Sequence, residues 1–158
     1  MQADMAVPRQ LLRTTLRLNE HTPHRARLVV RSWLGPGHPV VDDTELIASE
    51  LVTNAVKHAL QGPGRDWVRL RLDEDPAHVR LVVTDAGNPM SAPRCLPLPT
   101  DWDAWAGQLG GLGIATIAKM CEGVWGTYLT RHETRVVWCY VPIRRSGVAA
   151  AERQPPGQ

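Results

Sequence analysis

Two short segments joined by turn-forming residues constrain this chain most strongly. Residues 67–72 (WVRLRL) alternate apolar and polar side chains with a period of two, and residues 79–84 (VRLVVT) form a second, more apolar segment. Both are typical of strands, and Asp75-Pro76 between them is a turn signal. Since the two strands of a hairpin pair antiparallel, the fold is not expected to be wound from parallel strand–helix–strand units.

The rest of the chain predicts helices on one face of this sheet. The expected strands are residues 11–18, 67–72, 79–84, 123–129 and 134–142, and the expected helices are 23–34, 42–60 and 111–121. Pro23 suits the first helical position, and Asp42 or Asp43 would cap the second helix. This order predicts an α+β fold, a two-layer sandwich with a mixed, mostly antiparallel sheet.

Composition limits the chain to one domain and excludes several classes of protein. A length of 158 residues with 43% hydrophobic residues is enough for one core, and a net charge of +2 gives no overall nucleic-acid footprint. Three widely spaced cysteines fit neither a disulfide framework nor a zinc site. Because no targeting segment or long apolar run is present, we expect a cytoplasmic protein without membrane contact.

The domain is expected to occupy residues 23–142, after an N-terminal segment (1–22) that carries the first strand and before a disordered tail (143–158). Residues 86–110 have no periodicity and contain four prolines and two tryptophans. A loop of this length inside a compact domain predicts a lid or a binding loop.

The second predicted helix carries a polar stripe on its apolar side. Glu50, Asn54 and His58 are spaced at i, i+4 and i+8, beside Ile47 and Leu51. Burying a carboxylate and an amide without partners is costly, on the order of 2 kcal/mol or more for the amide alone. The stripe therefore lies at the helix edge in water, the commoner arrangement for a lone Glu and Asn, or it faces a ligand pocket.

Two further motifs stand at element ends. Asp85 ends an apolar strand and is followed by Ala86 and Gly87, although such an Asp alone is most often a turn starter. Gly111 and Gly113 open a helix whose free backbone N–H groups suit a phosphate. Neither a dinucleotide fingerprint nor a Walker motif is present.

Taken in order, these motifs resemble the boxes of the GHKL ATPase superfamily, which includes gyrase, the heat-shock chaperone, histidine kinases and MutL. Residues 49–59 (SELVTNAVKHA), 85–87 (DAG) and 111–114 (GLGI) resemble its N, G1 and G2 boxes. The first box is most similar to the bacterial anti-sigma-factor serine/threonine protein kinases. The resemblance spans about residues 23–142 and implies the Bergerat ATP-binding fold.

The resemblance also implies roles for the first box and for the protein. Asn54 would coordinate Mg²⁺ through its side-chain carbonyl, which suits a hard cation that takes other ligands from phosphate oxygens. Glu50 would be the general base that orients an attacking hydroxyl. The implied activity is transfer of the γ-phosphoryl group of ATP to a Ser or Thr of an antagonist protein. The sigma factor and this antagonist would compete for one surface.

The remaining boxes would hold the nucleotide. Asp85 would accept a hydrogen bond from the adenine amino group, and Gly87 would let the backbone lie close to the ring. Gly111 and Gly113 would place N–H groups on the phosphates, and Thr134 would lie near the nucleotide.

Two alternatives stay open at the sequence level. The G1 box usually continues to a second glycine, but Asn88-Pro89 follow here, which favours a weak or inactive ATP-binding module that sequesters its partner. The intact Glu50 opposes that alternative. A simple ATP hydrolase is disfavoured, because such domains carry a transducer domain for which the short tail leaves no room. The oligomeric state is open, a homodimer included.

Overall fold

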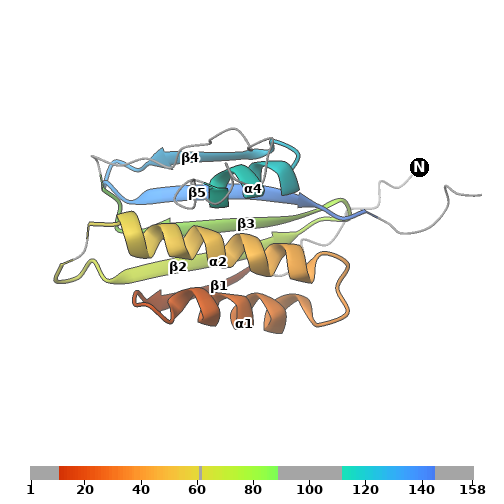
Figure 1. The fold of residues 1–158 in the computed structure, drawn as a ribbon, viewed down its shortest axis with the longest axis horizontal. Helices are drawn as coiled ribbons and strands as arrows, with labels where there is room; N and C mark the ends of the chain where they lie inside the picture. Colours follow the sequence, from red (N-terminus) through yellow and green to blue (C-terminus); the bar gives the residue numbers. More distant parts are fainter. Residues whose placement is uncertain (1–10, 61, 89–111, 145–158) are drawn as a thin grey trace, which may run out of the picture.

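The computed structural model describes residues 11–60, 62–88 and 112–144 (Figure 1). The strands are β1 (Leu12–Arg17), β2 (Trp67–Glu74), β3 (His78–Asp85), β4 (Trp125–Leu129) and β5 (Arg135–Pro142). The helices are α1 (Thr22–Leu34), α2 (Val41–His58) and α4 (Leu112–Met120). Each expected strand and helix is present, with bounds that differ by a few residues.

The strands form one sheet in the order β1-β2-β3-β5-β4. All four pairings in the described part of the chain are antiparallel. The expected mixed sheet was therefore wrong in this detail. The reason is topological: β4 would pair parallel with β3 if it lay beside it, but β5 lies between them.

The β2–β3 hairpin forms where the sequence predicts it. The Asp75 carboxylate accepts hydrogen bonds from the backbone N–H groups of Ala77 (2.7 Å) and His78 (2.8 Å). These bonds, the one from Ala77 above all, lower the pKa of Asp75. The turn therefore rests on a side chain that mimics a backbone acceptor.

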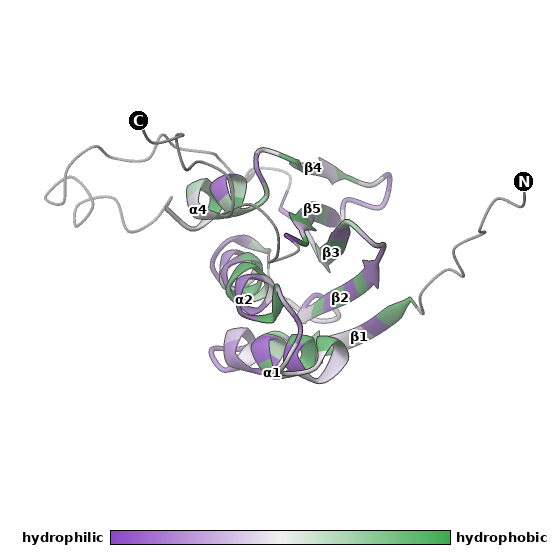
Figure 2. Ribbon diagram, turned by 90° about the vertical axis from the view of Figure 1, so that its right-hand side faces the viewer, coloured by the Kyte–Doolittle hydropathy of each residue, from purple (hydrophilic) through white to green (hydrophobic). Residues whose placement is uncertain are grey.

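All three described helices cover the same face of the sheet (Figure 2). Strand side chains alternate accordingly, with Val79, Leu81 and Val83 of β3 buried and their neighbours half-buried. The core between the layers is mostly aliphatic, and Cys121 and Cys139 lie in it as free thiols. Among the described residues, no helix is long and apolar enough to cross a membrane.

The ends of α2 differ from the expectation. The helix begins at Val41 after Val40, so Asp42 and Asp43 lie in its first turn and neither is the N-cap. Carboxylates in that position still stabilise the helix through its dipole. The helix ends at His58 because the Leu60 N–H turns away to donate to the carbonyl of Gly87 (3.0 Å).

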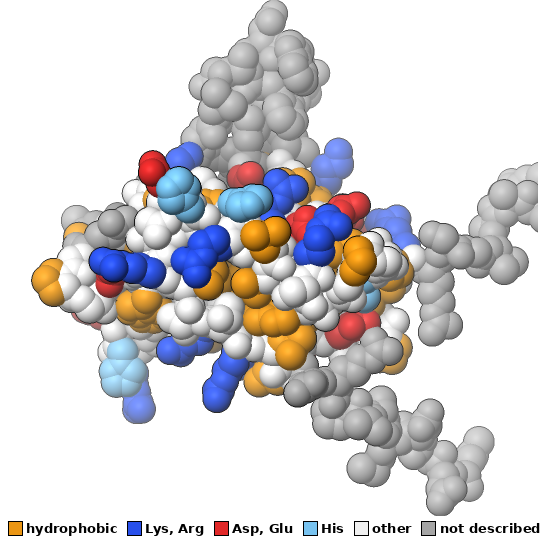
Figure 3. Space-filling model, turned by 90° about the horizontal axis from the view of Figure 1, so that it is seen from below, with side chains coloured by type: hydrophobic (Ala, Val, Ile, Leu, Met, Phe, Trp, Pro, Cys, Tyr) orange, Lys and Arg blue, Asp and Glu red, His pale blue; other side chains and the backbone are white. Residues whose placement is uncertain are grey.

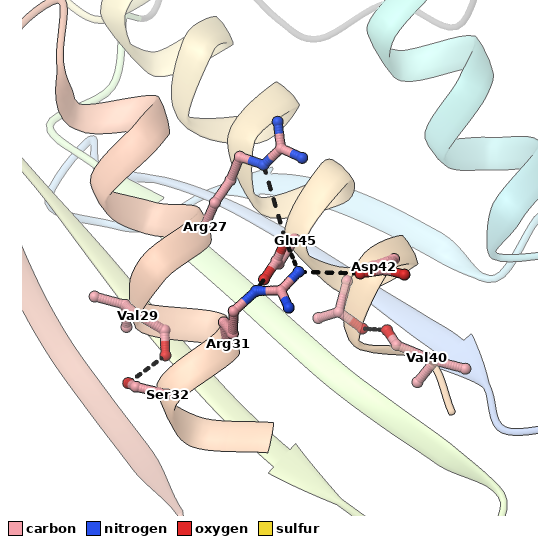
Figure 4. A network of polar contacts seen from close by, with 8 residues as sticks. Arg27, Val29, Arg31, Ser32, Val40, Asp42 and Glu45 are labelled. Atoms are coloured by element: carbon pink, nitrogen blue, oxygen red, sulfur yellow. Dashed lines mark hydrogen bonds and ion pairs between the residues drawn. The ribbon is translucent and has the colours of Figure 1, made fainter. Parts of the chain in front are cut away.

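A buried carboxylate fixes α1 against α2 (Figure 4). Glu45 of α2 is 4% exposed, and its two oxygens lie 2.5 Å from Arg31 Nε and 3.1 Å from an Arg31 terminal nitrogen. Arg27 Nε lies 3.9 Å from the same carboxylate. The bond to Glu45 raises the pKa of Arg31. This polar contact sets the position of α1 along the helix that carries Glu50 and Asn54.

Candidate functional site

The site begins where α2 meets α4. Glu50 is half-buried on α2, and its Oε2 atom lies so close to Gly113 of α4 that a side chain at Gly113 would displace the Glu50 carboxylate from this position. The missing side chain of Gly113 therefore leaves room for the Glu50 carboxylate beside α4. Two motifs that are far apart in the sequence come together here on the helical side of the sheet.

Asn54 lies one helical turn beyond Glu50 on α2. Its side chain is half-buried, and no residue in the described part of the chain forms a hydrogen bond with it. His58, the third member of the stripe, is exposed. The stripe is thus neither in the core nor fully in water: Glu50 and Asn54 are half-buried, Glu50 lies beside α4, and His58 is exposed.

Asp85 ends β3 and is 7% exposed to solvent. Its Oδ1 atom accepts a hydrogen bond from the Gly87 N–H (2.6 Å). Burial raises the pKa of Asp85, while this hydrogen bond and the charges of Arg135 and Arg65 act in the opposite direction. A carboxylate held in this way keeps a second oxygen that can accept a hydrogen bond from a ligand.

The turn after Asp85 is tied to the end of α2. Arg65 donates to the carbonyls of Ala86 (2.6 Å), Gly87 (3.2 Å) and Leu60 (2.9 Å). Together with the bond from Leu60 to Gly87, these contacts link Asp85 to the helix that carries Glu50 and Asn54. Figure 1 shows this end of α2 beside the end of β3.

Gly87 is required by both conformation and space. Its φ angle is +75°, and a side chain there would collide with the backbone carbonyl of Glu133, in the turn before β5. Gly87→Ala should therefore destabilise the fold by about 3 kcal/mol or more in urea unfolding. The matched control is Gly64→Ala: its φ is +73° but nothing lies within 4 Å, so only the conformational cost of about 1 kcal/mol is expected. Equal losses would show that the contact with Glu133 has no effect.

Sequence reasoning missed Arg65 and Arg135. Arg135 begins β5 directly opposite Asp85, is 8% exposed and donates to Thr127 Oγ1 (3.4 Å) and to the carbonyl of Asn88 (3.4 Å). No local motif marks either arginine, because each reaches the site through a long-range pairing. The strand register alone places Arg135 beside Asp85.

The structure gives less information on the expected nucleotide-binding residues Thr134 and Gly111. Thr134 lies next to Arg135, but its hydroxyl is 2.7 Å from that of Thr130 and closes the β4–β5 turn. Gly111, with the lid of 86–110 from Pro89 onward, lies outside the described residues. Within residues 11–60, 62–88 and 112–144, no three His, Cys, Asp or Glu side chains could together hold a metal ion.

Comparison with known proteins agrees with this geometry. Residues 16–140 match the sequence model of the histidine kinase-like ATPase domain. The fold is similar to the crystal structure of the RsbU and RsbW domains of Rv1364c from Mycobacterium tuberculosis, with a TM-score of 0.53 and 20% sequence identity. The match covers 90% of this chain and 35% of that one, so the chain spans about a third of that protein. A search of curated proteins gave no match. Because the match to the domain's sequence model covers most of the 158 residues, the chain belongs to the histidine kinase-like ATPase domain family.

Proposed function

We propose that this protein binds Mg·ATP and transfers its γ-phosphoryl group to a Ser or Thr of an antagonist protein, as an anti-sigma-type regulator. The observation that carries the proposal is the contact of Glu50 with Gly113. It brings a carboxylate to the start of the helix that resembles the phosphate-binding box. A helix start and a nearby base are the two parts that phosphoryl transfer needs from a protein.

The base of the nucleotide would lie at Asp85. A buried carboxylate whose Oδ1 is held by the Gly87 N–H can accept from the exocyclic amino group of adenine with its other oxygen. Guanine presents a carbonyl at that position, which the carboxylate would repel. The site therefore favours adenine. Thr134, on the turn beside Arg135, is the remaining residue proposed near the nucleotide.

The phosphates would lie between α2 and the start of α4. Backbone N–H groups at Gly111 and Gly113 would donate to phosphate oxygens, helped by the helix dipole. The side-chain amide of Asn54, which has no partner in the described residues, fits as one oxygen ligand of Mg²⁺. The ion would neutralise charge on the phosphate oxygens.

Glu50 would accept the proton of the attacking hydroxyl. Its carboxylate lies beside Gly113, next to the proposed phosphate site, and a carboxylate is a common general base. The partner protein supplies the hydroxyl, so the acceptor Ser or Thr must reach this point from outside. A sigma factor and the antagonist that is phosphorylated are the proposed partners, in the cytoplasm.

A second candidate is an ATP-binding module that sequesters its partner without catalysis. It is favoured by Asn88, which stands near the position of the second G1 glycine. Its side chain donates to the carbonyl of His58 (3.2 Å) and its carbonyl accepts from Arg135 (3.4 Å). These bonds fix the turn that follows Asp85, and a fixed turn is what nucleotide binding requires. They supply no group for phosphoryl transfer.

Titration calorimetry with Mg·ATP tests the shared part of both candidates. The wild type should bind Mg·ATP and lose most of that affinity when EDTA removes the metal. Asn54→Ala should weaken Mg·ATP binding by about 1.5–3 kcal/mol, the range for a hydrogen bond to a charged group, and metal-free ADP by much less. Equal weakening of both, or a lower melting temperature, would assign Asn54 a structural role. Absence of Mg·ATP binding by the wild type would overturn the proposal.

A further inference from the structure

The face of the sheet that the described helices leave uncovered carries arginines on its first two strands. On β2, Val68, Leu70 and Leu72 are buried in the core, so Arg69 and Arg71 point to the other face. On β1, Leu16 is in the core, and Arg13, Thr15 and Arg17 lie on the uncovered face. Figure 3 shows basic side chains projecting from the lower margin of the molecule, and others across its upper part.

These arginines are arranged against each other. Arg13 lies directly opposite Arg71 in the strand register, and Arg69 lies two residues before Arg71 on β2. Like charges in directly opposed positions destabilise a sheet. The arginine side chains lie on the face of the sheet away from the core. Packing in the core therefore does not offset the repulsion between Arg13 and Arg71.

The carboxylates on this face are already engaged. Asp73 is bound by Arg80 (2.5 and 3.0 Å), and Asp66 by Arg17 (3.0 Å). In the described residues, Arg13, Arg69 and Arg71 form no ion pair. Arg71 Nε is buried and has no hydrogen-bond partner. The structure therefore holds guanidinium groups that lack the anions they normally bind.

Apolar side chains lie beside the arginines. Val82 of β3 is the register partner of Arg71, and Trp138 of β5 is the partner of Val82. Trp138 packs edge-on against Tyr140, with ring centres 5.9 Å apart. We call the set Arg13, Arg69, Arg71, Val82 and Trp138 the basic–aromatic face.

We propose that the basic–aromatic face docks an acidic, partly apolar segment of a partner protein. Guanidinium groups bind carboxylates in pairs of parallel hydrogen bonds, and Val82 with Trp138 would take the apolar side chains between those carboxylates. The positive charge of this face argues for an acidic occupant from another protein. Residues 1–10 contain one Asp and one Arg, and residues 145–158 one Glu and two Arg, so neither end of the chain is acidic.

Two other occupants fit less well. A second copy of the chain would bring the same unpaired arginines to the interface. Single-stranded nucleic acid needs several free aromatic faces for stacking, but Arg69 covers Trp67 at 5.5 Å. The face lies on the opposite side of the sheet from Glu50 and Gly113, so the proposal does not depend on the ATP site.

The probe is a fluorescein-labelled peptide of about 20 residues that repeats Glu-Glu-Leu-Glu. Its binding is measured by fluorescence anisotropy at about 100 mM salt, a concentration at which pairs of exposed charges are only partly screened. Arg71→Gln and Arg13→Gln should each weaken binding at least about 10-fold. The matched control is Arg25→Gln, an exposed arginine on α1 with the same charge change, which should alter binding less than about 2-fold.

The melting temperature provides a second measurement, which distinguishes a lost binding contact from a misfolded variant. Because Arg13 and Arg71 oppose each other, Arg71→Gln should raise the melting temperature slightly while it weakens peptide binding. Peptide binding should be the same in Asp85→Asn, which separates this surface from the proposed ATP site. Absence of saturable binding by the wild type, equal weakening by Arg25→Gln, or tighter binding of a dT20 oligonucleotide through the same arginines would each overturn the proposal.

Discussion

Asp85→Asn should abolish recognition of adenine while the protein stays folded. The change replaces an acceptor with an amide whose N–H₂ group can face the adenine amino group. Mispairing of a buried polar contact costs about 2–4 kcal/mol, or about 30- to 900-fold in affinity. Calorimetry with Mg·ATP and Mg·GTP measures this, and the preference for ATP over GTP should also shrink, because the amide can donate to the guanine carbonyl.

The stability of this variant separates a functional role from a structural one. Burial raises the pKa of Asp85 above its ordinary value, so the folded protein retains a proton that the unfolded chain has already released. The stability contribution of Asp85 is therefore greatest below the ordinary aspartate pKa, falls as pH rises toward the raised pKa, and stays low above it.

Asparagine cannot titrate, so the Asp85→Asn variant should lack this fall. At pH 7 its free energy of unfolding should equal or exceed that of the wild type, provided that the amide oxygen keeps the bond from Gly87. Urea unfolding between pH 4 and pH 8 checks both statements. A variant that binds ATP normally, or one that is much less stable at pH 7, would contradict the role proposed for Asp85.

Glu50→Gln should separate the kinase from the sequestering module. Glutamine keeps the size of the side chain and its place beside Gly113, but it cannot accept a proton. A general base contributes typically 10²- to 10⁴-fold, which is about 3–5 kcal/mol of barrier. The variant should bind Mg·ATP like the wild type and transfer phosphate at least about 100-fold more slowly.

The assay uses radiolabelled ATP and the candidate antagonist protein encoded nearest to this one. Calorimetry with Mg·ATP on the same preparations is the control for binding. Transfer by Glu50→Gln at the wild-type rate would overturn the catalytic role of Glu50. If the wild type binds Mg·ATP tightly but transfers phosphate to no candidate, the sequestering module is the better account.

Local pattern was sufficient to predict the elements and the motifs. The alternation in 67–72 and the turn at Asp75 predicted a hairpin. This works because successive residues of a strand point to opposite faces of the sheet, so that burial follows position along the strand. The three boxes were recognisable because close approach and polar chemistry restrict residue types within a few positions. The same reasoning failed at Asp42, Leu60 and the mixed sheet, where the outcome depends on what lies nearby in space.

Tertiary structure alone decided how the motifs meet. Gly113 could be read as a helix start, but its contact with Glu50 depends on how α4 packs against α2. Arg65 and Arg135 reach Asp85 and its turn through hydrogen bonds and strand register, and the register also sets Arg13 against Arg71. A single sequence encodes the periodicity of each segment, whereas register and helix packing arise from the summed fit of all segments in one core.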